Sequence, residues 1–461
     1  MLHTVATMLS VITGEKCGYV RRPLVSTNDA SVINLDCNQS TPSSYYVPLQ
    51  FHDNAIHVVV QLLHCPTVPV GLFTSVSDKL TSLTVASEDA TNLLEGTFEG
   101  LGHLTELRLL GFSSLKDLSR SVFEPLRNIE TLILDGFGRS NIKLSHLGSA
   151  VKKLTNTPIK RLVFNDIRDY ASSRFVEDKI MRVVDFEITN ASVKELIVSN
   201  TPMIYEGSIR RAFPNLTCFY GSKINEQTEK SFPVMYDLVM LSNTLQEFIF
   251  KRYKYLGPVH ALPNVTRKQL FQVFVSALIY SSDLLSTYHN RPAAKDCAIG
   301  YKLLLGANVS RITIQRIKFM LNEQKPLCFE QDNKLEYLDV TGSPLPRNFP
   351  GIRGLTKLKY LSLANTRIES LPNDFLQYFP ALEILKLSQL DIGKFINSFD
   401  GNFFPVNPAL AEIHLDNCQL TDISSTLISG LIKFQRFCMT NMSTFPSTSN
   451  LTFAIAQILN F

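Results

Sequence analysis

Apolar residues recur along the chain in a short alternating run followed by a longer, looser one. In "LTELRLLGFSSLKDLSRSVF", Leu104, Leu107 and Leu109 are spaced so that the last two point to one side of an extended strand. Leu115, Leu118 and Phe123 follow at wider and less regular intervals. Strict alternation is typical of a strand that is buried on one face, and helical spacing does not account for the remainder. The pattern predicts a short strand followed by a return segment.

The same unit repeats through most of the chain. Clear copies begin at Leu104, Leu335, Leu358, Leu382 and Leu410, and weaker copies begin at Leu80, Ile129, Ile159, Val193, Leu216, Leu245, Val309 and Phe434. The step from Leu80 to Leu104 is 24 residues, and the steps from Leu335 through Leu358, Leu382 and Leu410 to Phe434 are 23, 24, 28 and 24 residues. A fixed period in the twenties with an L-x-x-L-x-L core is the signature of a leucine-rich repeat, in which one copy cannot bury its apolar face alone.

These repeats predict an α/β leucine-rich-repeat solenoid, a horseshoe with short parallel strands on its concave face. Loops, 3-10 turns and short helices should form the convex face, where we expect Phe98, Phe123 and Phe375 to stack as a column. Residues 1–16 are a weak match to a secretory signal peptide, because no Lys or Arg precedes their apolar run. The alternative is that they are an ordinary chain start with no targeting role. Residues 17–79 are a cysteine-containing cap, and residues 80–250 are repeats.

The remaining residues divide at an irregular segment. Residues 251–308 have room for two degenerate repeats or one insertion, with an amphipathic helix expected over 268–280 on the convex wall. Residues 309–461 are repeats again, and the sequence predicts an open C-terminal end because a further turn starts at Leu451 and stops.

Eight cysteines suggest how the ends of the repeat blocks are held. Cys17 and Cys37 are expected to close a short strand pair that turns at Asn28 and Asp29, and Cys297 is expected to pair with Cys328. The alternative is that the thiols are free and buried in a cytosolic repeat protein. Seven N-x-Ser/Thr sequons would carry glycan in a secreted protein; they lie at Asn38, Asn190, Asn215, Asn264, Asn308, Asn441 and Asn450.

Composition and motifs indicate a binding protein and not an enzyme. A net charge of +4 does not favour a polyanionic partner, and no apolar run is long enough for a transmembrane helix. The basic and aromatic run "KRYKY" (251–255) has the composition of a nucleic-acid contact, but its register turns Tyr253 toward the core, so nucleic acid is not favoured. We find no catalytic or cofactor motif, and no histidine has a second metal ligand at a familiar spacing.

The predicted concave face offers one contact patch for a ligand. Tyr337 and Tyr360 fall at the same position of successive repeats, beside Asp339 and Lys359. Tyrosine combines a large contact area with a hydroxyl group and loses little entropy on binding. The alternative is an ordinary solvated ladder that is stabilised by cross-strand contacts.

With its repeat core, its 24-residue step, its trailing phenylalanines and its cysteine-bearing cap, the chain resembles a Toll-like receptor ectodomain over residues 17–461. The resemblance implies a glycosylated extracellular or cell-surface horseshoe that binds a microbial or processed protein ligand. It also implies homo- or heterodimers through the solenoid flank, and a membrane span and cytoplasmic signalling domain that this chain does not contain. Two other readings stay open: a secreted adhesion or structural repeat protein, and an intracellular repeat scaffold.

The chain departs from that family at the asparagine which usually follows each strand. Other residues occupy this position, namely Phe112, Phe137, Ile167, Thr201, Tyr253, Ile317, Ser343, Thr366, Leu390 and Cys418. Thr, Ser and Cys can partly replace the amide as hydrogen-bonding groups, whereas Phe, Ile and Leu cannot. We therefore expect a less regular coil than a typical member of the family has.

Overall fold

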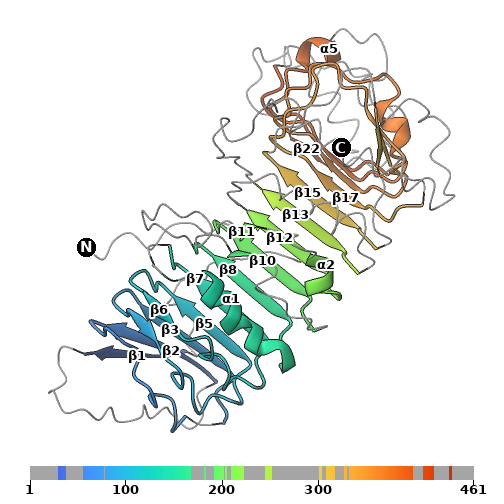
Figure 1. Cartoon of the computed structure of the whole chain (residues 1–461). Helices are drawn as coiled ribbons and strands as arrows, with labels where there is room; N and C mark the ends of the chain where they lie inside the picture. The colour runs from blue at the N-terminus through green and yellow to red at the C-terminus, as the bar shows by residue number, and fades with distance from the viewer. Residues whose placement is uncertain are drawn as a thin grey trace, which may run out of the picture. The chain divides into compact units, whose positions relative to one another are not determined.

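A computed structural model gives the architecture (Figure 1). The structure describes residues 30–37, 56–76, 78–138, 140, 142, 144–167, 181–182, 192–201, 203–204, 209–222, 244–251, 301–303, 308–316, 326–329, 332–397, 407, 409–419 and 436–438. The chain divides into two compact units: Met1–Asp237 with Lys254–Leu256, and Leu238–Tyr253 with Gly257–Phe461.

The first unit is a stack of parallel strands in chain order. Its rungs are β1 (Ala30–Asp36), β2 (His57–Leu63), β3 (Ser82–Ser87), β5 (Glu106–Leu110), β7 (Thr131–Asp135), β8 (Arg161–Asn165), β10 (Glu195–Ser199) and β12 (Cys218–Ser222). Each pairs in parallel with the next, and Leu107, for example, lies opposite Leu132. From β3 onward every rung begins two residues after a predicted repeat start, which confirms the repeat assignment for this unit.

The N-terminal cap differs from its prediction. β1 and β2 pair in parallel as two further rungs, with Asp36 opposite Leu63. Cys37 instead forms a disulfide with Cys65, with their Cα atoms 5.1 Å apart. The predicted pairing of Cys17 with Cys37 is therefore wrong. The reason is that parallel stacking brings together the residues that follow two successive rungs, at a separation a disulfide can span.

The second unit repeats the same architecture. Its rungs are β13 (Glu247–Lys251), β15 (Arg311–Gln315), β17 (Tyr337–Asp339), β19 (Tyr360–Ser362), β20 (Ile384–Lys386), β21 (Glu412–His414) and β22 (Arg436–Cys438). All successive pairs are parallel, and again each strand begins two residues after a predicted start. Each unit is thus a leucine-rich-repeat β-solenoid, as the sequence predicts.

Short elements complete the return segments of both units. In the first unit β4 (Asn92–Leu93) pairs with β6 (Asp117–Leu118), β9 (Met181–Arg182) pairs with β11 (Met203–Ile204), and the helical segments are α1 (Leu144–Lys152), η1 (Lys153–Asn156) and α2 (Ile209–Ala212). In the second unit β14 (Tyr301–Leu303), β16 (Leu327–Phe329) and β18 (Ile352–Arg353) form a sheet, with η7 (Phe375–Tyr378) and α5 (Gly393–Asn397). β14 lies within the segment that the sequence analysis treats as irregular.

A column of phenylalanines supports the return segments of the first unit. The rings of Phe98 and Phe123 stack with centroids 6.1 Å apart, as predicted, and Phe73 extends the column at 6.2 Å from Phe98. Phe375 is not part of it: it belongs to the second unit, where its ring meets Phe379 edge-on at 5.1 Å. Aromatic pairs in these geometries stabilise beyond their burial alone, so the column couples successive repeats.

The described residues that stand in place of the usual asparagine are buried, and the polar ones make hydrogen bonds; Tyr253 and Ile317 lie outside the described ranges. The Thr201 hydroxyl accepts the Ile167 N–H at 3.2 Å, and the Ser343 hydroxyl donates to the Ile314 carbonyl at 2.9 Å. The Cys418 thiol donates to the Leu387 carbonyl at 3.1 Å. Hydroxyl and thiol groups thus partly replace the amide, as expected from the sequence.

Several predictions concern residues outside the described ranges: the signal segment 1–16, the helix over 268–280, the open C-terminal end, and the sequons at Asn38, Asn190, Asn264, Asn441 and Asn450. Cys218 and Cys328 are disulfide-bonded. Because Cys297 also lies outside those ranges, its pairing with Cys328 stays a prediction. Within the described ranges we find no helix with the length and apolar character that a membrane crossing requires.

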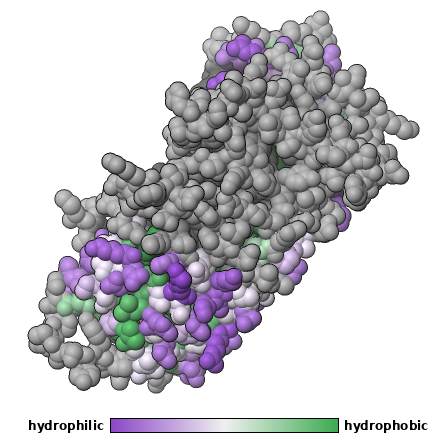
Figure 2. All heavy atoms as spheres, in the orientation of Figure 1, coloured by the Kyte–Doolittle hydropathy of each residue, from purple (hydrophilic) through white to green (hydrophobic). Residues whose placement is uncertain are grey.

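Several large apolar side chains of the first unit are exposed to solvent. Figure 2 shows a green apolar area among purple polar residues on the first unit. The large apolar side chains that the described residues expose are Val32, Ile56, Leu63, Val70 and Leu94. They come from the two N-terminal rungs and the segments that follow β2 and β4, where the repeat pattern is weakest.

Candidate ligand-binding face

Alternation along each rung separates the core face of the sheet from an outward face. In β19, Leu361 is completely buried in the core, and its neighbours Tyr360 and Ser362 point to the other side. Tyr337 lies directly opposite Tyr360, and Asp339 lies opposite Ser362. The predicted adjacency of the two tyrosines on successive rungs is confirmed.

The two tyrosines form the centre of a four-residue stack. Their rings are nearly parallel, at 7° and with centroids 4.1 Å apart. The Arg311 guanidinium lies 3.6 Å from the centre of the Tyr337 ring, and the Lys386 ammonium lies 5.4 Å from the centre of the Tyr360 ring. A cation over each outer face is attracted by the ring quadrupole, so four successive rungs hold one ordered array. We call these four residues the tyrosine stack.

Partial burial gives the tyrosine hydroxyls an unusual environment. Burial, and then the negative charge of Asp339, raise the pKa of Tyr337. Burial, with Tyr337 and Asp339 next, raises the pKa of Tyr360 strongly. Both hydroxyls are therefore neutral throughout the physiological range and can donate or accept hydrogen bonds. The tyrosine stack presents two cations and two neutral hydroxyls.

Asp339 and Lys359 occupy different positions from the tyrosines. Asp339 is 5% exposed, and its carboxylate accepts the Gln315 side-chain amide at 2.6 Å and the Thr341 N–H at 2.9 Å. These hydrogen bonds hold the Asp339 carboxylate in place beside the stack, two residues after Tyr337 on β17. Lys359 is exposed at the start of β19, where its ammonium lies 3.2 Å from the Glu336 carboxylate. A direct ligand contact by either residue stays a prediction.

The outward face of the first unit is less accessible in its middle rungs. Ile133, Val163 and Ile197, which lie opposite one another on β7, β8 and β10, are at most 5% exposed, and Tyr220 packs against them. Side chains that are already buried offer no surface to a ligand, so we place the candidate site on the second unit.

Two of the predicted glycosylation sequons lie among the described residues. Asn215 is exposed. Asn308 is partly exposed, and its side-chain oxygen accepts a hydrogen bond from the Lys334 ammonium at 2.9 Å.

The sequence analysis identified the tyrosines of the stack but not its cations. Arg311 is the register partner of Tyr337 one rung earlier, at the same repeat position. Lys386 follows Tyr360 one rung later but two residues further along the strand. Aligning the repeats by position would have found Arg311, whereas the diagonal contact of Lys386 depends on how the long side chain lies across the sheet.

Comparisons with known proteins concern the fold. No family model and no curated protein sequence matches the chain. Similar solved structures include the Toll–Spatzle complex of Drosophila, at 14% identity over 89% of this chain and 48% of that chain, with a TM-score of 0.46. The mouse RP105/MD-1 complex aligns at 15% identity over 87% of this chain and 58% of that chain, with a TM-score of 0.42.

A third similar structure is the TLR13–ssRNA13 complex, at 14% identity over 84% of this chain and 56% of that chain, with a TM-score of 0.39. The chain spans about half the length of the Toll structure (48%). The fold assignment rests on the repeats and on the strand registers. The chain is a leucine-rich-repeat solenoid in each of its two units.

Proposed function

We propose that the chain is the ligand-binding ectodomain of a Toll-like, innate-immune type receptor, which recognises a protein or microbial macromolecule. The observation that carries the proposal is the tyrosine stack, which is held on the outward face of four successive rungs. Solenoids use such faces as extended binding surfaces, because each rung contributes one position to the same ladder.

The Cys37–Cys65 disulfide supports an extracellular location. Disulfides persist in oxidising compartments and are rare in the cytosol, so the intracellular scaffold becomes the weaker alternative. Receptor signalling would require dimerisation and the segments that the resemblance implies beyond this chain.

The chemistry of the stack suggests the kind of surface it recognises. Pre-ordered aromatic rings lose little conformational freedom on binding, and Tyr and Arg are the residues that most often dominate binding energy. Arg311 and Lys386 add positive charge at both ends of the stack. We infer a ligand surface with an apolar centre and anionic groups at its edges.

A binding panel tests the proposal. The whole chain is secreted from a eukaryotic host, immobilised, and exposed to purified microbial lipoglycans, lipopeptides, cell-wall polysaccharides, nucleic acids and secreted proteins. We expect at least one macromolecule to bind, and the double variant Tyr337→Ala/Tyr360→Ala to weaken its affinity by roughly 30-fold or more, which corresponds to the loss of about 2 kcal/mol expected at a binding hot spot.

The matched control is Tyr378→Ala. Tyr378 also lies beneath an arginine, with the Arg353 guanidinium 4.3 Å from its ring centre, but it comes from η7 in a return segment. This control should leave affinity unchanged. Equal binding by the wild type and by the double variant would refute the proposed site, and no binding to any panel member would refute the receptor assignment in favour of a structural protein.

A further inference from the structure

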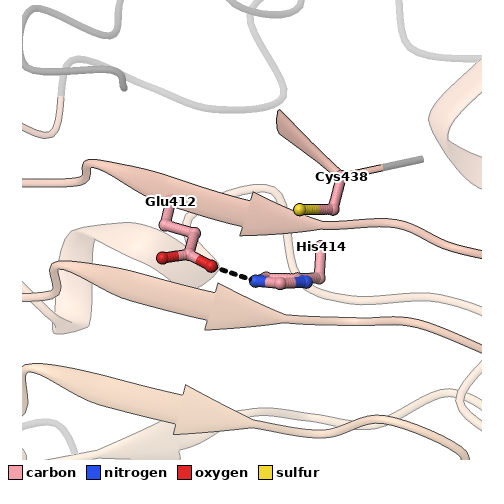
Figure 3. A group of neighbouring side chains, drawn as sticks. All are labelled: Glu412, His414 and Cys438. Carbon is pink, nitrogen blue, oxygen red and sulfur yellow. Dashed lines mark hydrogen bonds and ion pairs between the residues drawn. The ribbon is translucent and has the colours of Figure 1, made fainter. Parts of the chain in front are cut away.

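Three side chains with metal-binding chemistry meet on the outward face at the C-terminal end of the second unit. Glu412 and His414 lie two residues apart on β21 and therefore point to the same side. Cys438 on β22 is the register partner of His414. The carboxylate, imidazole and thiol groups all have a ligand atom within 4.8 Å of one another, and Figure 3 shows them converging.

Neighbouring groups orient the imidazole of His414. Its Nε2 atom makes a hydrogen bond with the Glu412 carboxylate, and its Nδ1 atom lies 3.9 Å from an Asp416 oxygen. The Ser388 hydroxyl donates to the same Asp416 oxygen at 3.3 Å. One ring nitrogen thus faces the cluster, while the other lies 3.9 Å from the Asp416 carboxylate, beyond hydrogen-bond distance. In known metal sites a hydrogen bond to the second ring nitrogen orients the histidine, and a small rotation of His414 or Asp416 would form one here.

The cluster is sheltered and has a negative potential. The side chains of His414 and Glu412 are 18% and 21% exposed. The carboxylates of Glu412 and Asp416 both lie near the imidazole. Their negative charge attracts a divalent cation, which displaces the proton of a thiol ligand when it binds. Two cationic side chains oppose that charge: Arg436 lies 3.7 Å from Glu412 with its side chain 68% exposed, and Lys386 on β20 is the register partner of His414.

We propose that Glu412, His414 and Cys438 form a binding site for a zinc-type transition-metal cation. Sulfur, nitrogen and oxygen donors together suit Zn²⁺, which binds them at about 2.0–2.3 Å in a tetrahedron. That geometry requires donor atoms roughly 3.3–3.8 Å apart, so small side-chain rotations from the present separations complete the site. Three protein ligands leave the fourth position to water or to a donor group of a bound partner.

This site is independent of the proposed ligand-binding stack. None of its three residues belongs to the stack, which ends at Lys386 on β20, whereas the site lies on the next two rungs, β21 and β22. An ion here would join the last two described rungs, β21 and β22, through side chains as well as backbone hydrogen bonds. Metal binding would then stabilise this end of the unit by mass action, because the cation binds the folded chain.

Cobalt substitution tests the proposal directly. The whole chain, with its disulfides intact and with any affinity tag removed, is treated with a chelator, desalted, and titrated with CoCl₂. We expect one equivalent to produce a thiolate-to-cobalt charge-transfer band that ZnCl₂ abolishes. The Cys438→Ser variant should lose the band, and His414→Gln should weaken binding at least tenfold.

Cys418→Ser is the matched control, since Cys418 and Cys438 are the free thiols among the described residues and only Cys438 belongs to the cluster. It should retain the band. A second measurement does not require Cys438 to be replaced: ZnCl₂ should slow alkylation of Cys438 in the wild type and not in His414→Gln. Two results would overturn the proposal and leave a His–Glu ion pair. One is a charge-transfer band that survives in Cys438→Ser. The other is the absence of a band together with alkylation of Cys438 that ZnCl₂ does not slow.

Discussion

Removing the disulfide between the two N-terminal rungs should loosen that end of the molecule by a predictable amount. Cys37 and Cys65 are 28 residues apart in the sequence. The chain-entropy relation for a loop of that length gives an entropy loss of about 12 cal/mol/K in the unfolded chain, or about 3.6 kcal/mol at 25 °C. Each 1.4 kcal/mol is tenfold in an equilibrium constant, so the opening equilibrium should rise by roughly 400-fold in a Cys37→Ala/Cys65→Ala variant.

The effect should be local because a solenoid contacts only its neighbouring repeats. Among the described rungs, only β2 lies beside β1. The disulfide joins the residues that follow these two strands. Amide hydrogen exchange, measured on proteolytic peptides, should therefore accelerate in residues 30–63 and remain unchanged in residues 335–390. The matched control, Cys418→Ser, removes a thiol without opening a disulfide.

Two results would refute this reasoning. Peptide mapping of the unreduced chain could find Cys37 bonded to Cys17, which would exclude the crosslink between Cys37 and Cys65. Alternatively, exchange in residues 30–63 could be the same in the double variant and in the wild type. That outcome would mean that the hydrogen bonds and packing of the first rungs hold this end without help from the crosslink.

Two further predictions concern the core and the free thiols. Phe98→Ala should destabilise the first unit by about 3–5 kcal/mol, because it removes a fully buried ring that stacks on both sides. Phe98→Leu should cost clearly less, because leucine fills most of the cavity. Urea unfolding measures both variants, and equal losses would contradict the cavity argument, since both substitutions remove the ring stacking. Burial raises the pKa of Cys418 to about 11, so roughly one molecule in a thousand carries the thiolate at pH 8. Iodoacetamide at that pH should modify the half-exposed Cys438 and spare Cys418 until the chain unfolds, and rapid native labelling of Cys418 would contradict its burial.

The arrangement within each unit has a direct bearing on function. Rungs of three or five residues leave only two or three outward positions each, so a functional surface of any size must be assembled from several repeats. Tyr337 and Tyr360 come from rungs 23 residues apart, as their register shows. Glu412 and His414 share a strand, but Cys438 comes from the next one. Substitutions in one repeat should therefore affect neighbouring sites through the shared ladder.

The repeat pattern alone determined the rungs of the main ladder from β3 to β22, since each of these rungs begins two residues after a predicted start. It also determined the adjacency of Tyr337 with Tyr360 and the stacking of Phe98 with Phe123. These follow from local spacing, because a parallel stack turns equal repeat positions into spatial neighbours.

Tertiary structure decided the features in which register or side-chain direction matters. β1 and β2 lack the leucine pattern, and only their parallel pairing shows that Cys37 meets Cys65. The diagonal reach of Lys386 across the sheet depends on how a long side chain lies on neighbouring rungs. Glu412, His414 and Cys438 meet because strand alternation and register act together. Sequence spacing sets which repeat positions become neighbours, and the packing of side chains between rungs then selects which of those neighbours touch.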